Sequence, residues 1–600
     1  MYSEGQSGRN SRKKGWFVPA VAALLLIMMM VGLRCVALDS DAYPRLSWSS
    51  ALLTDEGFYL HNARNRILFG HAQTDQFNNA LIMPVLDAVQ TGVFHLFGVG
   101  AVSARAISVV LGLLTLPVFC DALRRAFGLR TAGFGLLLLG LDHVSLLYSR
   151  LALMDTPAAF VLVCAFWLWV RSGEGQEAGS GRKRIWLALC GLVLGVCYSV
   201  RGLGALVYPV PILLLGGDLW RAWRGRERGE NSAGAGEGRA ALLGLLSLVG
   251  GLIVALGVYG AVWYLPHRAE LTRVNHYYLF DQLMPHSLNA VRQNVTRTLF
   301  GYERGCSSYL LHHAPVQFVL ALMGLASWSI RGGGVDMQNA PRRNAVYLGW
   351  WLLIAWTVFG IVRYAPQRYY VIFYPALTGI AALVLSDAAA VVRTVLNHRT
   401  ARTLLGGFLT YHLCEAGLQH ASGTAEAVLY GVTALVGIGL FCVQPGRLLG
   451  LHADFLRPTM VLAVWAAVNA LWLGDWLTHL RYTQRDADRW LAANLPANSV
   501  LIGDAAPGLC LNSRFVAVSV IPGLCNDRRP LETFAASARY VVILDGQRNT
   551  DWWRSRYPDV IRSERLKRTF PRLINFEVTV YEVPTEAAPA STPVSETVRF

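Results

Sequence analysis

Residues 12–33 read RKKGWFVPAVAALLLIMMMVGL, three basic residues followed by an apolar run from Trp16 to Leu33. A run of this length can cross a bilayer as a helix. No small-residue cleavage site follows it, so we interpret it as a retained first span and not as a signal peptide. Similar apolar runs recur as far as Trp476. This pattern predicts a mainly α-helical, polytopic membrane protein.

The composition supports the same class of protein. The 600-residue chain is 54% hydrophobic and 15% charged, whereas soluble domains usually carry about a quarter charged residues. A soluble, disordered or disulfide-stapled chain is therefore excluded. The formal net charge is +16, but the basic residues form short clusters between apolar runs. They indicate membrane topology, and we expect no nucleic-acid partner.

Hydrophobic length predicts about thirteen membrane spans. They are expected near Trp16–Leu33, Val102–Leu123, Thr131–Tyr148, Pro157–Val170, Ile185–Val200, Leu203–Leu219, Ala240–Tyr264, Pro315–Ile330, Ala345–Val362, Tyr369–Leu385, Leu404–Leu418, Ala425–Val443 and Pro458–Trp476.

The stretch Ala80–Gly98 is also long enough to cross, but Asp87, Thr91 and His95 make a polar stripe on one helical face. We expect an interfacial helix here. With this helix left out of the count, the clusters Arg124/Arg125/Arg130, Arg182/Lys183/Arg184, Arg221/Arg224/Arg226/Arg228, Arg342/Arg343 and Arg393/Arg399/Arg402 share one side with the N-terminus. The positive-inside rule then predicts a cell-membrane protein with a cytoplasmic N-terminus and an extracytoplasmic C-terminal part.

The tail changes character after Trp476. We expect a membrane domain over 1–476, a small extracytoplasmic α/β domain over 477–584 and a disordered tail over 585–600. The α/β domain is predicted from a helical stretch and four β-type runs: Asp486–Leu495, Ser499–Ile502, Phe515–Val520, Tyr540–Leu544 and Phe576–Val583. Cys510 and Cys525 lie in this compartment, where oxidation is permitted, so a bridge between them is a second expectation.

The first outer loop contains the hexapeptide TDEGFY, residues 54–59. In a helix that starts here, Asp55 and Tyr59 share one face. The alternative is an ordinary helix start, with Thr54 as the cap and Asp55 and Glu56 in the favourable first turn. As the functional interpretation, Asp55 is a general base that removes a proton from an acceptor, and Glu56 and Tyr59 bind substrate.

A second acidic motif, Asp155-Thr156-Pro157, follows the tripeptide Tyr148-Ser149-Arg150. It also fits an ordinary helix start. Two short acidic motifs, remote in sequence, nevertheless reach the same membrane face. Asp155 is therefore a second candidate catalytic residue, which orients the acceptor or shares a divalent cation with Asp55. No other cofactor is expected, and Arg150 is a candidate substrate-binding residue.

Cations on the predicted outer face complement these acids. Arg201 interrupts an apolar run, and Arg363, Arg368 and Tyr369 flank a turn at Pro366. A guanidinium group can hold phosphate with two hydrogen bonds. These residues are candidate substrate-binding residues for a lipid phosphate at the interface. The alternative is that Arg201 and Arg363 extend toward lipid headgroups.

The order of these motifs resembles the GT-C glycosyltransferases, and within them the protein O-mannosyltransferase and aminoarabinose (lipid A) transferase group. The segment Gln367-Arg368-Tyr369-Tyr370 to Pro375-Ala376 adds to the resemblance. It implies an inverting transfer of a sugar from a polyprenyl-phosphate donor at the outer face. By position, Asp55 matches the family's catalytic acidic residue in the first loop, and Asp155 matches the acidic residue of the second loop. Arg201 matches a basic residue that binds phosphate, and Arg368 matches the turn with a basic residue and a tyrosine.

The chain departs from this group where relatives often carry a charged residue or histidine before the interfacial helix. Here the residues are Phe77-Asn78-Asn79-Ala80. The acceptor, whether lipid, glycan or protein, is therefore left open. A transporter or flippase of a lipid-linked or anionic solute is the alternative from another class, but no internal repeat is evident. An O-antigen ligase or polymerase is a third interpretation.

Overall fold

The computed structural model describes residues 7–174, 181–227, 233–301, 305–330, 340–419, 458–534, 539–546 and 548–583. The helices of the first half are α1 Ser7–Cys35, α2 Ala51–Phe69, α3 Pro84–Phe97, α4 Ala101–Phe127, α5 Leu129–Gly140, α6 His143–Tyr148, α7 Asp155–Gly173, α8 Gly181–Val200, α9 Pro209–Glu227, α10 Ala233–Tyr259, α11 Arg268–His276 and α12 Leu288–Phe300. Those of the second half are α13 Cys306–His313, α14 Pro315–Ile330, α15 Ala340–Ile361, α16 Tyr374–Ser386, α17 Ala388–Asn397, α18 Arg399–Gln419, α21 Pro458–Thr478, α22 Thr483–Asn494, α23 Ala506–Leu509, α24 Pro530–Thr533 and α25 Arg548–Arg556.

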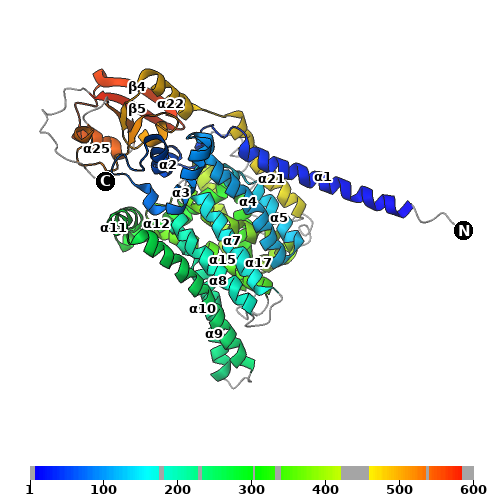
Figure 1. Cartoon of the computed structure of the whole chain (residues 1–600). Helices are drawn as coiled ribbons and strands as arrows, with labels where there is room; N and C mark the ends of the chain where they lie inside the picture. Colours follow the sequence, from blue (N-terminus) through cyan, green and yellow to red (C-terminus); the bar gives the residue numbers. More distant parts are fainter. Residues whose placement is uncertain are drawn as a thin grey trace.

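Short 3-10 and π-helical segments join these helices, and five strands follow them. The short segments are η1 Pro44–Leu46, η2 Asn79–Ile82, η3 Gly202–Val207, η4 Gly260–Tyr264, η5 Tyr277–Leu283, η6 Gln367–Ile372 and η7 Ser563–Arg565. The strands are β1 Val500–Ile502, β2 Val516–Val518, β3 Arg539–Leu544, β4 Leu566–Leu573 and β5 Phe576–Val583. Figure 1 shows a long helical bundle with the sheet at one end, next to α2.

The structure is that of a multispan membrane protein. Among the described residues, seven helices are long and apolar enough to cross a membrane, or eight if α16 and α17, bent by 94°, form one span. The expected spans at the N-terminus and at Pro315–Ile330 correspond in this part of the chain to shorter apolar helices, Val21–Cys35 and Pro315–Ile330. The expected span at 425–443 lies outside the described residues.

A break in the backbone divides one of the expected spans. The expected span Thr131–Tyr148 is interrupted where α5 ends at Gly140, and the Asp142 side chain accepts a hydrogen bond from the Ser145 N–H (3.0 Å) at the start of α6. The described part of the helix over Pro315–Ile330 has 16 residues, and the residues that follow it, 331–339, lie outside the described chain.

The stretch expected to lie at the interface forms η2 and then α3, which has 14 residues and is not among the candidate spans of the described chain. Asp87 from the polar stripe is buried and its carboxylate lies 3.9 Å from the Arg66 guanidinium of α2. Leu96 and Phe97 are 74% and 76% exposed. Of the polar stripe, Asp87 is thus packed on the protein and His95 is exposed, and the end of the helix presents apolar side chains outward, as an interfacial helix does.

The C-terminal strands form a mixed sheet in the order β2-β1-β3-β5-β4. Strand β1 pairs parallel with β2 and β3, and β5 pairs antiparallel with β3 and β4. The four expected strands and the helix before them are present. Strand β4 was not expected, because its sequence LKRTFPRL is basic, contains a proline and is largely exposed.

The expected Cys510–Cys525 bridge is wrong, since both thiols are free and buried. Cys510 packs in the main hydrophobic core, whereas Cys525 belongs to a separate cluster with Phe77 and Leu271. The Cys525 thiol donates a hydrogen bond to the Ser519 carbonyl (3.4 Å). The two cysteines are therefore packed in different hydrophobic clusters.

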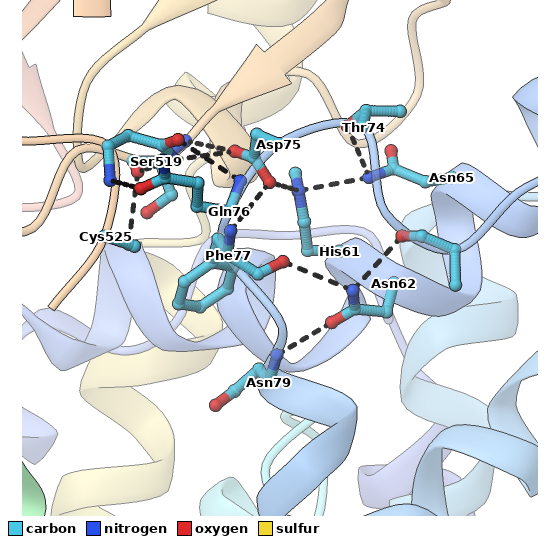
Figure 2. A network of polar contacts seen from close by, with 12 residues as sticks. His61, Asn62, Asn65, Thr74, Asp75, Gln76, Phe77, Asn79, Ser519 and Cys525 are labelled. Atoms are coloured by element: carbon cyan, nitrogen blue, oxygen red, sulfur yellow. Dashed lines mark hydrogen bonds and ion pairs between the residues drawn. The ribbon is translucent and has the colours of Figure 1, made fainter. Parts of the chain in front are cut away.

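A buried polar network ties the sheet to the loop after α2 (Figure 2). The Asp75 carboxylate accepts hydrogen bonds from the Ser519 N–H (3.0 Å) and from the Asn526 amide (3.1 Å). Its other oxygen lies 3.3 Å from His61 of α2. Asn526 and Gln76 also exchange backbone-to-side-chain hydrogen bonds. Because Asp75, Gln76 and Asn526 are paired across the contact, the network sets one position of the sheet relative to α2.

Candidate active site

Helix α2 carries the first acidic motif, but not at its start. The helix begins at Ala51, its N-cap Ser50 makes no side-chain cap, and no acidic residue lies in its first turn. The interpretation of Asp55 as a favourable first-turn acid therefore does not hold. Asp55 and Tyr59 are one turn apart, both less than a tenth exposed. Burial of a carboxylate in mid-helix is costly unless a cation balances it.

Arg368 supplies that cation. Its guanidinium makes an ion pair with the Asp55 carboxylate and donates a hydrogen bond to the Tyr59 hydroxyl. Arg368 lies in the short helix η6 directly after Pro366, and only 7% of it is exposed. The sequence places these residues more than 300 positions apart, and the fold brings them into one buried contact.

Asp155 and Arg201 form a second buried pair. An Asp155 oxygen lies 2.6 Å from an Arg201 Nη, and the two side chains are 1% and 4% exposed. Asp155 is the first residue of α7, and Arg201 lies in extended backbone between α8 and η3. Both charged residues, Asp155 and Arg201, thus lie at helix ends.

Tyr369 joins the two pairs. The Arg201 guanidinium lies 4.6 Å from the centre of the Tyr369 ring, and the Arg368 guanidinium lies 5.1 Å from the same ring. A cation near an aromatic face is stabilised by the ring quadrupole. The result is one cluster of two carboxylates, two guanidinium groups and a tyrosine, with formal charges that cancel.

The cluster borders a cavity of about 940 Å³. Asp55, Tyr59, Arg201, Arg368 and Tyr369 line it, whereas Asp155 lies behind Arg201 and does not. The remaining wall comes from η3, the π-helical segment η5, the end of α15 and the C-terminal sheet; among its residues are Tyr198, Leu203, Tyr259, Leu271, Tyr277, Tyr278, Arg363, Tyr364, Asp504 and Trp552. A cavity of this size, mostly apolar with a few convergent charges, is typical of a ligand site.

Arg363 lines the same cavity at a different point. Its backbone N–H donates to the Leu283 carbonyl (2.8 Å), and its guanidinium donates to the His286 imidazole (3.0 Å). These contacts tie the end of α15 to the segment around η5. Arg363 therefore helps to form the cavity rim, apart from the two buried ion pairs.

Glu56 was expected to bind substrate, but the structure places it away from the cavity. It makes a two-point ion pair with Arg105 of α4 (2.6 and 2.8 Å), and its carboxylate accepts a hydrogen bond from the Ala152 N–H (2.7 Å). Neighbouring residues of a helix point about 100° apart, so Glu56 cannot share the face of Asp55. It instead connects α2 to the turn that leads into Asp155.

Arg150 is likewise not in the cavity. Its guanidinium donates hydrogen bonds to the carbonyls of Leu33, Arg34 and Ala37 (2.8–3.0 Å) and lies 4.5 Å from the Trp476 ring centre. These contacts satisfy the carbonyls at the end of α1. Arg150 is a structural residue that fastens α1 to the bundle.

Glycine at position 57 allows the sheet to approach the site. A Cβ at Gly57 would lie 2.3 Å from the Gly508 nitrogen, so the backbones of α2 and α23 are in direct contact. The Arg64 guanidinium of α2 also donates to the carbonyls of Ser513 and Phe515 (2.7 and 2.8 Å). The helix that carries Asp55 is therefore held by the C-terminal part of the chain.

Burial changes the proton affinity of the groups on α2. Desolvation raises the pKa of Asp55 to about 6, although the nearby Arg368 acts in the opposite direction. Desolvation also raises the pKa of Tyr59 well above its usual value. At neutral pH Asp55 is thus a carboxylate with a strong affinity for a proton, which suits a general base.

The carboxylates of Asp55 and Asp155 do not fit the shared divalent cation considered from the sequence. Each is already engaged by an arginine. Within the described parts of the chain, no group of three or more His, Cys, Asp or Glu side chains is placed to hold a metal ion. We therefore derive no step through a metal.

Several residues of the site were not identified from the sequence. Tyr364 lines the cavity, and its hydroxyl is hydrogen-bonded to that of Ser49 (3.2 Å). Tyr278 of η5 and Trp552 of α25 also line the cavity. Tyr364 lies beside the turn at Pro366, so its position in the sequence was a usable signal. For Tyr278 and Trp552 there was none, because only the tertiary fold brings their segments to the cavity.

The chain is similar to known glycosyltransferases. Residues 83–256 match the family described as dolichyl-phosphate-mannose-protein mannosyltransferase. No curated protein matches the chain by sequence.

Among solved structures, the chain is similar to ArnT from Cupriavidus metallidurans in the apo state, with 18% identity, a TM-score of 0.54, and coverage of 97% of this chain and 100% of that one. ArnT bound to undecaprenyl phosphate matches with 18% identity, a TM-score of 0.53, and coverage of 96% and 99%. The apo oligosaccharyltransferase of Archaeoglobus fulgidus matches at 13% identity and a TM-score of 0.44 over 87% and 69%. The similarity to ArnT shows a shared fold.

Proposed function

We propose that this chain, a membrane glycosyltransferase of the GT-C type, transfers a sugar from a polyprenyl-phosphate donor to a lipid, glycan or protein acceptor, with inversion at the anomeric carbon. The observation that carries the proposal is the pair of buried Asp–Arg contacts joined by Tyr369 at the wall of a large cavity. The family match over residues 83–256 favours transfer over transport by a flippase.

The two guanidinium groups are the donor-binding part of the proposal. A donor phosphate that enters the cavity would compete with the carboxylates for Arg368 and Arg201, because phosphate and carboxylate both fit a guanidinium. The ArnT relative has been solved with undecaprenyl phosphate bound. During transfer, negative charge develops on the departing polyprenyl phosphate, and these groups would stabilise it in a partly dehydrated site.

Release of Asp55 from Arg368 is the catalytic part. While paired, the carboxylate is partly neutralised; once the donor phosphate engages Arg368, the proton affinity of Asp55 increases further. Asp55 then removes the proton from the acceptor nucleophile as the anomeric carbon is attacked from the face opposite the phosphate. Asp155 does not line the cavity, and in this proposal it holds Arg201 in position.

The site is proposed to face the extracytoplasmic side. We place the membrane part at 1–476, the extracytoplasmic part at 477–584 and a tail at 585–600, with the arginine clusters in the cytoplasm. Reporter fusions after Arg228 and after Arg485 should report opposite sides of the membrane. Two reporters on the same side would overturn this orientation.

Binding of undecaprenyl phosphate to the purified full chain tests the donor assignment. Arg201→Ala should weaken binding by about tenfold or more, the value of one lost charged contact. Because Arg201→Ala leaves Asp155 buried without its partner, the charge-neutral double variant Arg201→Gln/Asp155→Asn serves as the folded counterpart. Unchanged affinity in both variants would remove Arg201 from the donor site.

A further inference from the structure

The C-terminal sheet has a ligand-binding edge by its topology. Strand β1 lies between β2 and β3 and is parallel to both, so the carboxyl ends of three strands meet at one edge. The chain leaves β1 toward β2 and later returns to β3 on its other side. In open α/β sheets, ligands bind outside the carboxyl ends at such a switch point.

This edge faces the cavity of the candidate active site. Asp504 follows β1, Ile521 and Pro522 follow β2, and Trp552 lies on α25, which follows β3; all four line the cavity. Each of the three parallel strands thus sends the segment after its carboxyl end into the same wall. Asp55, Arg201 and Arg368 line the same cavity.

The edge is held in a set position relative to Asp55. The Gly57–Gly508 backbone contact lies in the segment just after β1. The Ser519 N–H after β2 donates to Asp75, in the network of Figure 2. A Cβ at Gly523 would lie 3.6 Å from the ring of Tyr277, another cavity residue.

The chemistry of the edge suits a saccharide. The indole of Trp552 is partly exposed and packs edge-on against Trp553, with ring centres 5.0 Å apart and an angle of 89° between the planes. An aromatic face accepts the apolar C–H side of a sugar ring. Asp504, which is 8% exposed, adds a negative charge to this wall.

The charges of the cavity separate this surface from the donor side. Of the described residues that line the cavity, the arginines Arg201, Arg363 and Arg368 all come from the membrane part. The residues after β1, β2 and β3 that line the cavity include an acid and no base, and the nearby Arg556 guanidinium lies 5.7 Å from the centre of the Trp552 ring. A phosphate is therefore favoured on the membrane side, where three guanidinium groups line the cavity.

We infer that the carboxyl edge of the β2-β1-β3 sheet is the acceptor subsite and binds the saccharide portion of a hydroxyl-bearing acceptor, with Trp552 as its platform. The inference rests on the proposed function and narrows its acceptor from lipid, glycan or protein to a carbohydrate group. That group is either a free glycan or the headgroup of a glycolipid, since both present the same rings and hydroxyls.

Saturation-transfer NMR on the purified full chain in detergent tests this. The probes are methyl α-mannopyranoside, methyl β-glucopyranoside, methyl β-galactopyranoside and methyl N-acetyl-β-glucosaminide, each also as an octyl glycoside below its micellar concentration, and a Ser/Thr-rich octapeptide. We expect transfer to the ring C–H protons of at least one glycoside. Trp552→Ala should weaken its binding about tenfold. Trp490→Ala, in the same part of the chain but outside the cavity, should not.

The inference is overturned if no glycoside binds, if Trp552→Ala binds it as well as the unchanged chain does, or if the octapeptide binds instead in a manner that depends on Trp552. Stronger binding of the octyl form indicates a glycolipid, and equal binding a free glycan.

Undecaprenyl phosphate binding, measured on the same samples, should be unaffected by Trp552→Ala. If the unchanged chain does not bind undecaprenyl phosphate, the proposed function is contradicted, and the glycoside result can still be interpreted on its own. Thermal unfolding of each variant identifies misfolded samples, and Trp552→Phe, which keeps an aromatic face, should then retain binding.

Discussion

Replacement of Gly57 by alanine tests how the sheet positions the catalytic helix. The added Cβ would lie 2.3 Å from the Gly508 nitrogen, 2.6 Å from its Cα and 2.7 Å from the Pro507 carbonyl carbon. Ordinary contacts between such atoms are about 3.5–4.0 Å. All three atoms belong to the backbone, so no side chain can rotate away. Helix α2 and the segment at α23 must therefore separate by about 1 Å.

The separation moves Asp55, which lies two residues before Gly57 on the same helix. A misplacement of about 1 Å at a reacting group can cost about 100-fold in rate. We expect Gly57→Ala to lower transfer by this factor and to lower the unfolding temperature, although alanine is otherwise the better helix former.

The assay is mass spectrometry of surface glycans and lipids from cells that carry each variant in place of the unchanged gene, with product followed over time. Gly92→Ala on α3 is the matched control, because nothing lies within 4 Å of its added Cβ; it should leave transfer and stability unchanged. Near-normal transfer and stability in Gly57→Ala would refute the argument that backbone contact with the sheet positions Asp55.

Two further predictions concern the same helix. The pKa of Asp55 in the donor-free chain is raised to about 6 by burial, and only its carboxylate form accepts a proton. Transfer at donor concentrations well below saturation should therefore fall about tenfold per pH unit below about pH 6. The pKa of Asp87 is also raised to about 6 by burial, but Asp87 lies outside the cavity, so Asp87→Asn should keep this acid limb; a rate that is flat down to about pH 5 would count against Asp55 as the base. Glu56→Gln leaves Arg105 buried without its counter-charge, which should cost about 3–5 kcal/mol of stability. The loss is measured as a lower midpoint of thermal unfolding. An unchanged midpoint would show that the Glu56–Arg105 ion pair does not hold α2.

The class of fold was predictable because bilayer-length apolar runs and clustered arginines follow from the membrane itself. The exact helix boundaries were not, since hydropathy does not register a break such as the one between Gly140 and His143, where Asp142 starts a new helix. The sheet was predictable from its buried, β-branched strands. Strand β4 was missed because its side chains are exposed and its pairing with β5 depends on the backbone.

The candidate site was partly predictable for a similar reason. Asp55, Arg201 and Arg368 interrupt or flank apolar segments, where an uncompensated charge is costly, and the structure brings them together. Glu56 was assigned to the same site only because it follows Asp55. Its true partner, Arg105, is set by the rotation of the helix. Trp552 lies about 500 residues after Asp55 in the chain, and no motif in the sequence around Trp552 indicates that it lines the cavity.

The most direct test of the central claim is the choice of donor. The purified full chain in detergent is supplied with a polyprenyl-phosphate sugar or, separately, with UDP- and GDP-sugars, together with an acceptor extract from cells that lack the gene. We predict product only from the polyprenyl-phosphate sugar, with a loss of about two to four orders of magnitude in Asp55→Asn. Efficient transfer from a nucleotide sugar by the chain alone, or near-normal turnover by Asp55→Asn, would contradict the account.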